Sequence, residues 1–545
     1  MIKTGIRAWI LCLAMFFTAA PALADNVCTA PVDTAQGAIS GVADDDYEAC
    51  SYRGIPFARP PLGDLRFKRP EPPSPHEGVY RAVDFGPACI QKPDITMGGK
   101  AERYCEDCLY LNVWRPKRPG RFPVMVWFYG GGFMGGAGSF DIYDGAHLAV
   151  RENVVVVTIN YRLGPLGYLA LPELKAEDPR NSTGNYGIMD QVRSLQWVQK
   201  NISAFGGDPD NVTVFGQSAG AMSICTLLVS PEARGLFHKA MMMSGPCRLF
   251  TSYEKGVEKS RAYAAELGCT GEGEELIDCL RDRPARDFNR KPPNDLFNAG
   301  TAWSPTVDGS FLPEMPLDMI EEGNYRKVPV IISTTRDELR NYTMAIPGLG
   351  LWSKGAVKSL LKLLTGDNAK DILELYDFKD YRRPIDLAFA FGNQMVFETP
   401  MFMMAEAMYD KNPVYLYRFD WNDTRFPNKM GAFHAIDVPF VFGALDLDME
   451  LANMLASRET YEQYGYLGGM MMDYVGSFAR TGDPNTEGLP YWPRYTAHDR
   501  ERLIVDRQII HMTMTTPEIL RYRYFASREL GEILEGDLVK AMADE

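Results

Sequence analysis

The sequence is poor in histidine, in internal repeats and in basic residues. Only six histidines occur among 545 residues, and none lies at the spacing of a zinc site. No period of about 20 to 50 residues recurs, which excludes solenoids and propellers. The 57 Lys and Arg are outnumbered by 71 Asp and Glu, for a formal charge of −14. Because nucleic-acid binding needs a net basic face, we expect no nucleic-acid partner, and we expect no metal or cofactor.

The remaining composition is that of a globular α/β protein. The hydrophobic fraction is 46% and the charged fraction 23%, which excludes disordered and fibrous chains. Strand-like and helical patterns alternate, which indicates a mainly parallel, doubly wound sheet. The strand-like runs are 121–129, 153–161, 211–216, 239–245 and 328–333, and the helical ones 187–202 and 218–229. No linker interrupts this alternation, so we expect one domain over residues 25–545.

The first 24 residues have the features of an export signal. Lys3 and Arg7 are followed by an apolar stretch over residues 8–20, and Ala22-Leu23-Ala24 ends in the small residues that a signal peptidase needs. The stretch is too short for a membrane-spanning helix, so no stable membrane anchor is expected. Cleavage before Asp25 would lower the formal charge to −16 and give a secreted or periplasmic protein.

Cysteines are expected to form disulfides in an exported protein. Of the ten cysteines, nine remain without Cys12, so at least one must be unpaired. The candidate pairs are Cys269 with Cys279, Cys89 with Cys108, and Cys28 with Cys50. Cys225, in an apolar helical pattern, is interpreted as a buried free thiol. The sequence does not assign partners to Cys105 and Cys247.

The segment Gly216-Gln217-Ser218-Ala219-Gly220 lies where a predicted strand ends and a helix begins. A Gly-x-Ser-x-Gly motif at such a junction is typical of a nucleophile elbow, a tight turn that presents the serine above a sheet. The glycines of YGGGF (129–133) follow an earlier strand and leave backbone amides open to a ligand. The amides of Gly131, Gly132 and Ala219 are therefore predicted to form an oxyanion hole, with Ser218 as the nucleophile.

Further segments carry a resemblance to a known family. They are YRGIPFARPPLGDLRF, EDCLYLNVWRP, INYRLGPLGYLAL, GNYGIMDQ, GAFHAIDVPFVFG and FARTGDPN (52–67, 106–116, 159–171, 184–191, 431–443 and 478–485). In these motifs, from about Gly37 to the C-terminus, the chain resembles the type-B carboxylesterase/cholinesterase family of α/β-hydrolases. The resemblance implies that fold, with helices on both sheet faces and long loops around an active-site gorge. It also implies a serine esterase, which we take for a bacterial exported member.

The resemblance also implies the base and the acid. His434 in GAFHAIDVPF matches the family's catalytic histidine, whereas the other five histidines do not fit the expected order of nucleophile, acid and base. In the motif TTRDE, the family's acid corresponds to Glu338. Asp337 and Asp308 are the alternatives, and Leu339 stands where the family usually has glycine. Two more features resemble the family. One is Ser244, which would hydrogen-bond the acid and the histidine; the other is a set of structural ion pairs, Arg162 with Asp190 and Arg53 with Glu106.

The resemblance is weaker for the choice of ester. Cholinesterases of this family bind the ammonium group on a tryptophan in the loop corresponding to 89–108, and this loop has none. They carry glutamate before the nucleophile, whereas this chain has Gln217. Asn341 and Tyr342 stand where aromatic residues are common. These differences argue against cholinesterase activity. Three methionine clusters (Met241 to Met243, Met401 with Met403 and Met404, and Met470 to Met472) are interpreted as core rather than acyl pocket.

The sequence thus predicts an esterase that acts through Ser218, His434 and Glu338 on a small-molecule ester. A specialised detoxifying or lipid-ester hydrolase with the same residues is the alternative. A non-catalytic adhesion protein of the same fold is disfavoured, because all three residues are present. The sequence leaves open whether the protein is a monomer or a homodimer.

Overall fold

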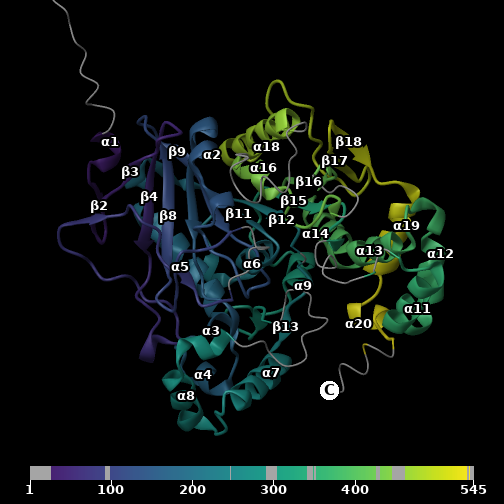
Figure 1. The fold of residues 1–545 in the computed structure, drawn as a ribbon, viewed down its shortest axis with the longest axis horizontal. Coiled ribbons are helices and arrows are strands. Elements are labelled where there is room, and N and C mark those ends of the chain that lie inside the picture. The colour runs from purple at the N-terminus through teal and green to yellow at the C-terminus, as the bar shows by residue number, and fades with distance from the viewer. Residues whose placement is uncertain are drawn as a thin grey trace, which may run out of the picture.

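A large mixed β-sheet forms the centre of the molecule (Figure 1). The computed structural model describes residues 26–92, 99–245, 247–289, 303–340, 348, 351–424, 430–444, 461–536 and 539. The expected signal, residues 1–24, and the positions Asn341 and Tyr342 lie outside these described residues.

Within the described residues the central sheet has eleven strands. Their order is β18 (Ile509–Thr513), β17 (Glu501–Val505), β16 (Val414–Phe419), β15 (Val330–Thr335), β12 (Lys239–Met243), β11 (Gly207–Gln217), β9 (Phe122–Phe128), β10 (Val155–Ile159), β8 (Tyr110–Pro116), β4 (Ala49–Pro56) and β3 (Val42–Ala43). The seven strands from β17 to β10 run parallel to their neighbours. Antiparallel pairs close both ends of the sheet. The sheet is therefore parallel where the expected elbow lies.

Short strands lie apart from the central sheet. β1 (Val32–Thr34), β2 (Gly37–Ser40) and β5 (Val79–Arg81) form one small sheet. The remaining strands form two pairs, β6 (Ala88–Cys89) with β7 (Tyr104–Cys105), and β13 (Thr251–Ser252) with β14 (Thr306–Val307).

Helices and long loops surround the sheet. The helices are α1 (Asn26–Thr29), α2 (Ala146–Glu152), α3 (Gly164–Tyr168), α4 (Pro172–Glu177), α5 (Tyr186–Asn201), α6 (Ala219–Val229), α7 (Tyr253–Glu266), α8 (Gly273–Asp282), α9 (Pro316–Glu321), α11 (Lys354–Thr365), α12 (Ala369–Leu375), α13 (Pro384–Asn393), α14 (Thr399–Met408), α16 (Val438–Phe442), α18 (Tyr461–Thr481), α19 (Thr516–Ala526) and α20 (Leu530–Ile533). A π-helical turn, η11 (Gln394–Glu398), joins α13 to α14. The order of strands and helices is that of an α/β-hydrolase, as predicted.

The main hydrophobic core lies on the parallel strands. All five residues of β10 and all of β12 are buried, because a parallel sheet covered by helices has no solvent-facing side. The methionines of β12 are part of this core, as the sequence predicted. A second, smaller core joins α11, α12, α13, α19 and α20, which lie together on the right of Figure 1.

Among the residues that the structure describes, eight cysteines form four disulfides. Three are the candidate pairs, Cys28–Cys50, Cys89–Cys108 and Cys269–Cys279. The fourth joins Cys225 to Cys247, so the prediction of a free thiol at Cys225 is wrong. The sequence could not show this pair because it depends on how the strands are arranged in the fold. β12 runs parallel beside β11, so the loop after β12 passes beside α6, the helix that carries Cys225. Within the described part of the chain, the free cysteine is Cys105, which is exposed.

Of the two ion pairs that the resemblance implied, one forms and the other does not. Arg162 and Asp190 do form a buried pair at 2.8 Å. Glu106, however, binds Arg66, with the Nε–Oε1 and Nη2–Oε2 distances at 2.6 and 2.7 Å. Arg53 lies instead over the ring of Phe85. Arg66 is suited to the buried position because its Nη1 also donates to backbone carbonyls near residue 281, which satisfies the rest of its guanidinium.

Candidate active site

Ser218 lies in a strained turn between β11 and α6. β11 ends at Gln217 and α6 begins at Ala219, so Ser218 is the residue that reverses the chain. Its φ of 56° and ψ of −121° are unusual for any residue but glycine. The backbone N–H of Ser218 donates to the carbonyl of Met243 in the neighbouring strand at 2.8 Å, which holds the turn in place. This geometry is that of a nucleophile elbow.

The glycines of the motif are required by close backbone contacts. A Cβ atom on Gly220 would lie 1.9 Å from the carbonyl oxygen of Phe128, at the end of β9. A Cβ on Gly216 would lie 2.7 Å from the backbone of Gly220. Only hydrogen fits at these two positions, so the elbow can lie directly against the loop that follows β9.

That loop carries the predicted oxyanion amides. Gly131 and Gly132 have φ values of 115° and 59°, which favour glycine. Among the described residues, no hydrogen bond engages the backbone N–H of Gly131, Gly132 or Ala219. Ala219 is the first residue of α6, where the helix leaves its amides without partners and adds a partial positive charge. These three amides are available to an anionic ligand atom near Ser218.

A buried glutamine fixes the far end of the glycine loop. The side-chain amide of Gln91 donates to the carbonyl of Gly136 at 2.8 Å and accepts from its N–H at 2.7 Å. Gln91 belongs to the segment between Cys89 and Cys108, so the disulfide loop supports the oxyanion loop. The sequence analysis did not identify this contact, because nothing in the local pattern marks Gln91.

His434 and Glu338 are joined directly. The Nδ1 of His434 lies 2.5 Å from the Oε2 of Glu338. The Oε1 of Glu338 accepts from the backbone N–H of Thr335 at 2.7 Å. The side chain of Glu338 is fully buried and that of His434 is 6% exposed. An ionised Glu338 can only accept hydrogen bonds, so it places the imidazole proton on Nδ1 and leaves a lone pair on Nε2. With this tautomer, the Nε2 of His434 can accept a proton.

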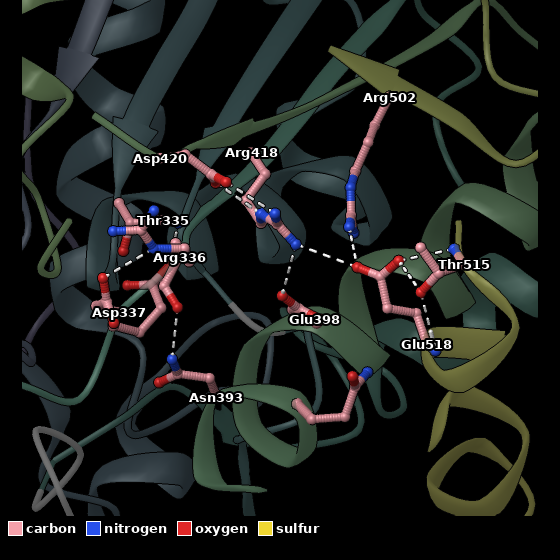
Figure 2. Close-up of polar contacts among 12 residues, drawn as sticks. Thr335, Arg336, Asp337, Asn393, Glu398, Arg418, Asp420, Arg502, Thr515 and Glu518 are labelled. Atoms are coloured by element: carbon pink, nitrogen blue, oxygen red, sulfur yellow. Dashed lines mark hydrogen bonds and ion pairs between the residues drawn. The ribbon is translucent and has the colours of Figure 1, made fainter. Parts of the chain in front are cut away.

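Leu339, which follows Glu338 in place of the family's usual glycine, is accommodated without strain. Its φ is not positive, and its N–H donates to the Oδ1 of Asn393 at 3.1 Å. The Nδ2 of Asn393 donates to the carbonyl of Arg336 at 2.8 Å, as Figure 2 shows. The end of α13 therefore holds the loop that carries Glu338.

The two alternative acids have other partners. Asp337 accepts from the N–H of Ala432 at 3.0 Å and pairs with Arg336 and Arg340. Asp308 accepts from Ser182, from the N–H of Thr183 and from Asn185. Neither carboxylate is joined to His434 by a hydrogen bond within the described part of the chain. Glu338 remains the candidate acid.

The structure does not join the hydroxyl of Ser244 to the acid or the histidine. Ser244 is fully buried at the end of β12, and its N–H donates to the carbonyl of Ser333 at 2.9 Å. Its Oγ has no hydrogen-bond partner among the described residues. The hydrogen bonds that the resemblance implied for this hydroxyl are absent among the described residues.

A second buried carboxyl group lies behind the histidine, three residues after it. Asp437 is fully buried and accepts from the hydroxyl of Tyr417 at 2.8 Å. Burial, together with the charge of Glu338, raises the pKa of Asp437 to about 7, although Tyr417 and His434 oppose the shift. The sequence motif that contains His434 also contains Asp437, but only the fold shows that it is buried beside the pair.

Two further side chains reach the imidazole of His434. The ring of Phe397, in the π-helical turn η11, lies with its centroid 5.4 Å from that of His434. The Nε2 of Gln217 lies 2.9 Å from the Nε2 of His434. Among the described residues, no hydrogen bond joins the Oγ of Ser218 to His434. Gln217 therefore contacts the Nε2 of His434, which is the nitrogen that would accept the proton of Ser218.

A network of buried ion pairs lies beside the loop that contains Thr335, Arg336 and Asp337 (Figure 2). Arg418 in β16 binds Asp420 with Nε–Oδ1 and Nη2–Oδ2 distances of 2.7 and 2.8 Å, and it reaches Glu518 at 3.1 Å. Arg502 in β17 also binds Glu518. Burial alone would raise the pKa of Glu518, but Arg502, the Thr515 amide and Arg418 lower it to about 2. This network joins two strands to the first turn of α19.

The other histidines lie in other surroundings. His498 and His511 are exposed, with 93% and 53% of their side chains accessible. His147 contacts Gly443, and His238 contacts the backbone of Val212. Across the described ranges, no group of three or more His, Cys, Asp or Glu side chains could hold a metal ion. No helix of the described residues is long and apolar enough to cross a membrane.

The geometry can be compared with known proteins. The family model described as "Carboxylesterase family" matches residues 28–519. The chain belongs to the carboxylesterase family. It is 40% identical over 489 residues to a para-nitrobenzyl esterase of Bacillus subtilis (strain 168), an alignment that covers 88% of this chain and 95% of the relative. It is 34% identical to an acylcarnitine hydrolase of Mus musculus, covering 87% of this chain and 86% of the relative.

A solved para-nitrobenzyl esterase structure gives the same result for the fold. It is 36% identical to this carboxylesterase, with a TM-score of 0.78, and the match covers 90% of this chain and 99% of that one. The protein is therefore an enzyme of the type-B carboxylesterases with the α/β-hydrolase fold, and it hydrolyses carboxylic esters. Small-molecule esters are its substrates.

Proposed function

We propose that this carboxylesterase acts through Ser218 as nucleophile, His434 as general base and Glu338 as the acid that orients the base. The observation that carries the proposal is the buried contact between His434 and Glu338, with the Ser218 elbow at the end of β11, which β12 separates from β15 in the sheet. The amides of Gly131, Gly132 and Ala219 would hold the oxyanion.

The reaction follows in two halves. His434 accepts the proton of Ser218 through Nε2 while Oγ attacks the ester carbonyl. The tetrahedral intermediate collapses when the imidazolium gives this proton to the leaving alkoxide oxygen. Water then attacks the acyl-enzyme, with His434 again as base, and the carboxylic acid and free Ser218 are released. None of these steps assigns a role to a metal or a cofactor.

The test is hydrolysis of a panel of nitrophenyl esters of graded acyl length, together with para-nitrobenzyl esters, which the name of the Bacillus subtilis relative suggests. Ser218→Ala should lower kcat by at least about 10³-fold while the protein stays folded, because an attacking oxygen is lost. Equal rates for the wild type and Ser218→Ala would refute the assignment. Esters of bulky alcohols and of polycarboxylic acids, added to the panel, separate a broad carboxylesterase from a specialised one.

We further propose that residues 25–545 form one catalytic domain that is exported after cleavage of residues 1–24. The four disulfides support export, because such bonds persist mainly in oxidising compartments. N-terminal sequencing of the protein from its native host should begin at Asp25. Sedimentation velocity of the exported protein distinguishes a monomer from a homodimer.

A further inference from the structure

The thiol of Cys105 belongs to a group of three cysteines, together with the disulfide that joins Cys89 to Cys108. The strands β6 and β7 run parallel to each other, and their register pairs Cys89 with Cys105. A hydrogen bond from the N–H of Ala88 to the carbonyl of Arg103, at 2.9 Å, holds the two strands together. The fold therefore sets a free thiol next to one half of an existing disulfide.

Cys89 is within disulfide-forming distance of both other cysteines. Its Cα lies 4.9 Å from the Cα of Cys108. Neighbouring strands in a ladder are about 4.8 Å apart, so Cys105 lies at a similar distance on the paired strand. Cα atoms that are about 4.4–6.8 Å apart can be joined by a disulfide. Cys89 can thus form either bond, but only one of them at a time.

The three cysteines differ in exposure. Cys89 is 3% exposed and Cys108 is 1% exposed, whereas Cys105 is exposed. A thiol in solution therefore has little access to the disulfide, while the thiol of Cys105 can lose its proton to water and attack from within the chain. Proximity makes this internal attack far more frequent than one by a dilute external thiol. Cys105 is thus the thiol that is best placed to exchange with this disulfide.

The segment that carries both partners of Cys89 is anchored between them. Glu106, the residue after Cys105, is 9% exposed and binds Arg66 through both carboxylate oxygens, at 2.6 and 2.7 Å. This ion pair holds residues 105–108 against the rest of the fold, whichever of the two cysteines is bonded. A change of partner therefore displaces mainly the side of the bond that carries Cys89.

The strand that carries Cys89 also supports the glycine loop that follows β9. The side-chain amide of Gln91 donates to the carbonyl of Cys89 at 3.0 Å and to that of Gly136 at 2.8 Å. Gln91 is 6% exposed, and its Oε1 accepts from the N–H of Gly136 at 2.7 Å. A shift of Cys89 toward Cys105 would thus reach the glycine loop through one buried side chain.

We propose that Cys105 and the Cys89–Cys108 disulfide form a thiol-exchange site that adjusts the glycine loop. The thiolate sulfur of Cys105 attacks the Sγ of Cys89 and forms the Cys89–Cys105 bond. The bond between Cys89 and Cys108 breaks, and its electron pair leaves with the Sγ of Cys108, which takes a proton from water. One disulfide and one thiol are present before and after, so the exchange needs no oxidant or reductant. It does not depend on which residues hydrolyse the ester.

Disulfide mapping of the wild type tests the exchange. The protein is incubated at about pH 8, where thiolates form, then quenched with acid and unfolded, and its free thiols are alkylated before peptide mass spectrometry. We expect a Cys89–Cys105 peptide with alkylated Cys108 in at least about one molecule in a hundred, because both bonds are within disulfide range. Alkylation of Cys105 alone, or a disulfide between the Cys105 residues of two copies, would overturn the proposal.

Two serine substitutions isolate the two pairings. Cys105→Ser retains the Cys89–Cys108 bond, whereas Cys108→Ser leaves Cys105 as the partner of Cys89. Cys105→Ser should keep the kcat/KM of the wild type on a nitrophenyl ester. Cys108→Ser should form the Cys89–Cys105 bond and lower kcat/KM by about three- to tenfold, because the glycine loop is displaced. A folded Cys108→Ser variant with free thiols at Cys89 and Cys105, or with the kcat/KM of Cys105→Ser, would overturn the proposal.

The double variant Cys105→Ser/Cys108→Ser is the matched control, since it can form neither bond. Cys108→Ser should melt several degrees above it, because a disulfide restricts the unfolded chain. Equal melting temperatures would show that the Cys89–Cys105 bond does not form in the folded protein and would overturn the proposal. If Cys108→Ser does not fold, the map of the wild type decides. A wild type that hydrolyses no ester refutes the proposed function instead, and the map still decides the exchange.

Discussion

The side of the site that carries Ser218 is held mainly by the backbone, whereas the side that carries His434 and Glu338 is held mainly by side chains. Around Ser218 the contacts are a glycine against the Phe128 carbonyl and the Ser218 N–H bonded to Met243. Around Glu338 they are the carboxylate on the Thr335 amide and the Asn393 amide across the loop. The difference teaches that a motif can specify the first side locally, whereas distant residues build the second.

The largest loss of stability is expected near Ser218, at a glycine whose surroundings leave no room for a side chain. Gly220→Ala should prevent folding of the active enzyme, or cost about 4 kcal/mol or more, because its Cβ would overlap the Phe128 carbonyl. Gly465→Ala is the matched control in another helix, α18, since no described residue lies within 4 Å of its Cβ position. That change should stabilise the protein by about 0.5–1 kcal/mol. Thermal unfolding of both variants measures the contrast. Equal melting temperatures would contradict the backbone explanation.

On the side-chain side, the largest effect is expected at the acid. Glu338→Gln should lower kcat by about 10³- to 10⁴-fold with the fold retained, because a neutral amide no longer fixes the tautomer of His434. Asp337→Asn, a change to the adjacent carboxylate, should lower kcat by less than about tenfold, because Asp337 contacts Ala432 rather than the imidazole. Steady-state kinetics and circular dichroism check both variants. If the two losses were reversed, Asp337 would be the acid.

Loss of the buried ion-pair network around Glu518 should lower the stability of the fold rather than the rate of the reaction. Its charged partners lower the pKa of Glu518 from its ordinary value of 4.5 to about 2. The ionised carboxylate therefore stabilises the fold fully above about pH 4.5, and this contribution is lost as the pH falls toward 2. Glu518→Gln should cost about 3 kcal/mol at pH 7.

The pH dependence of the free energy of unfolding distinguishes the contribution of this network from that of exposed ion pairs. The difference in unfolding free energy between the wild type and Glu518→Gln should narrow as the pH is lowered from 5 to 3. Glu48→Gln is the control, since 81% of the Glu48 side chain is exposed and its contact with Lys117 is 3.6 Å. Such exposed pairs contribute about 0–1 kcal/mol. A constant difference for Glu518→Gln across this range would show that its carboxylate is not the stabilising group. Urea unfolding at each pH gives the values.

The smallest loss of activity is expected from a substitution that tests whether the position of the loop near Ser218 depends on a side chain. Gln91→Leu removes both hydrogen bonds to Gly136 and should lower kcat/KM by about three- to thirtyfold, through a looser oxyanion loop. The expected loss is small because the glycine turns themselves remain. A loss as large as that of Glu338→Gln would mean that the two sides are built alike. The same nitrophenyl ester assay measures it.

The local features of the site were predictable from sequence. A strand followed by Gly-x-Ser-x-Gly and a helix specifies the elbow, since only glycine fits beside the carbonyl at Gly220. Gly131 and Gly132 in the loop after β9 have positive φ values, which glycine adopts without strain. The resemblance to the family predicted His434 and Glu338 as base and acid. In the structure, the Nδ1 of His434 lies 2.5 Å from the Oε2 of Glu338.

Only the tertiary structure decided which side chains meet across the fold. Cys225 forms a disulfide with Cys247, and Glu106 forms an ion pair with Arg66 rather than with Arg53. The hydroxyl of Ser244 lacks the expected hydrogen bonds among the described residues. The tertiary structure also set Gln217 against the base. Turns and strand ends follow from the φ preferences and sizes of neighbouring residues, which are written in the sequence. A long-range partner depends on where separate loops end in space, and that position is fixed only when the whole core has packed.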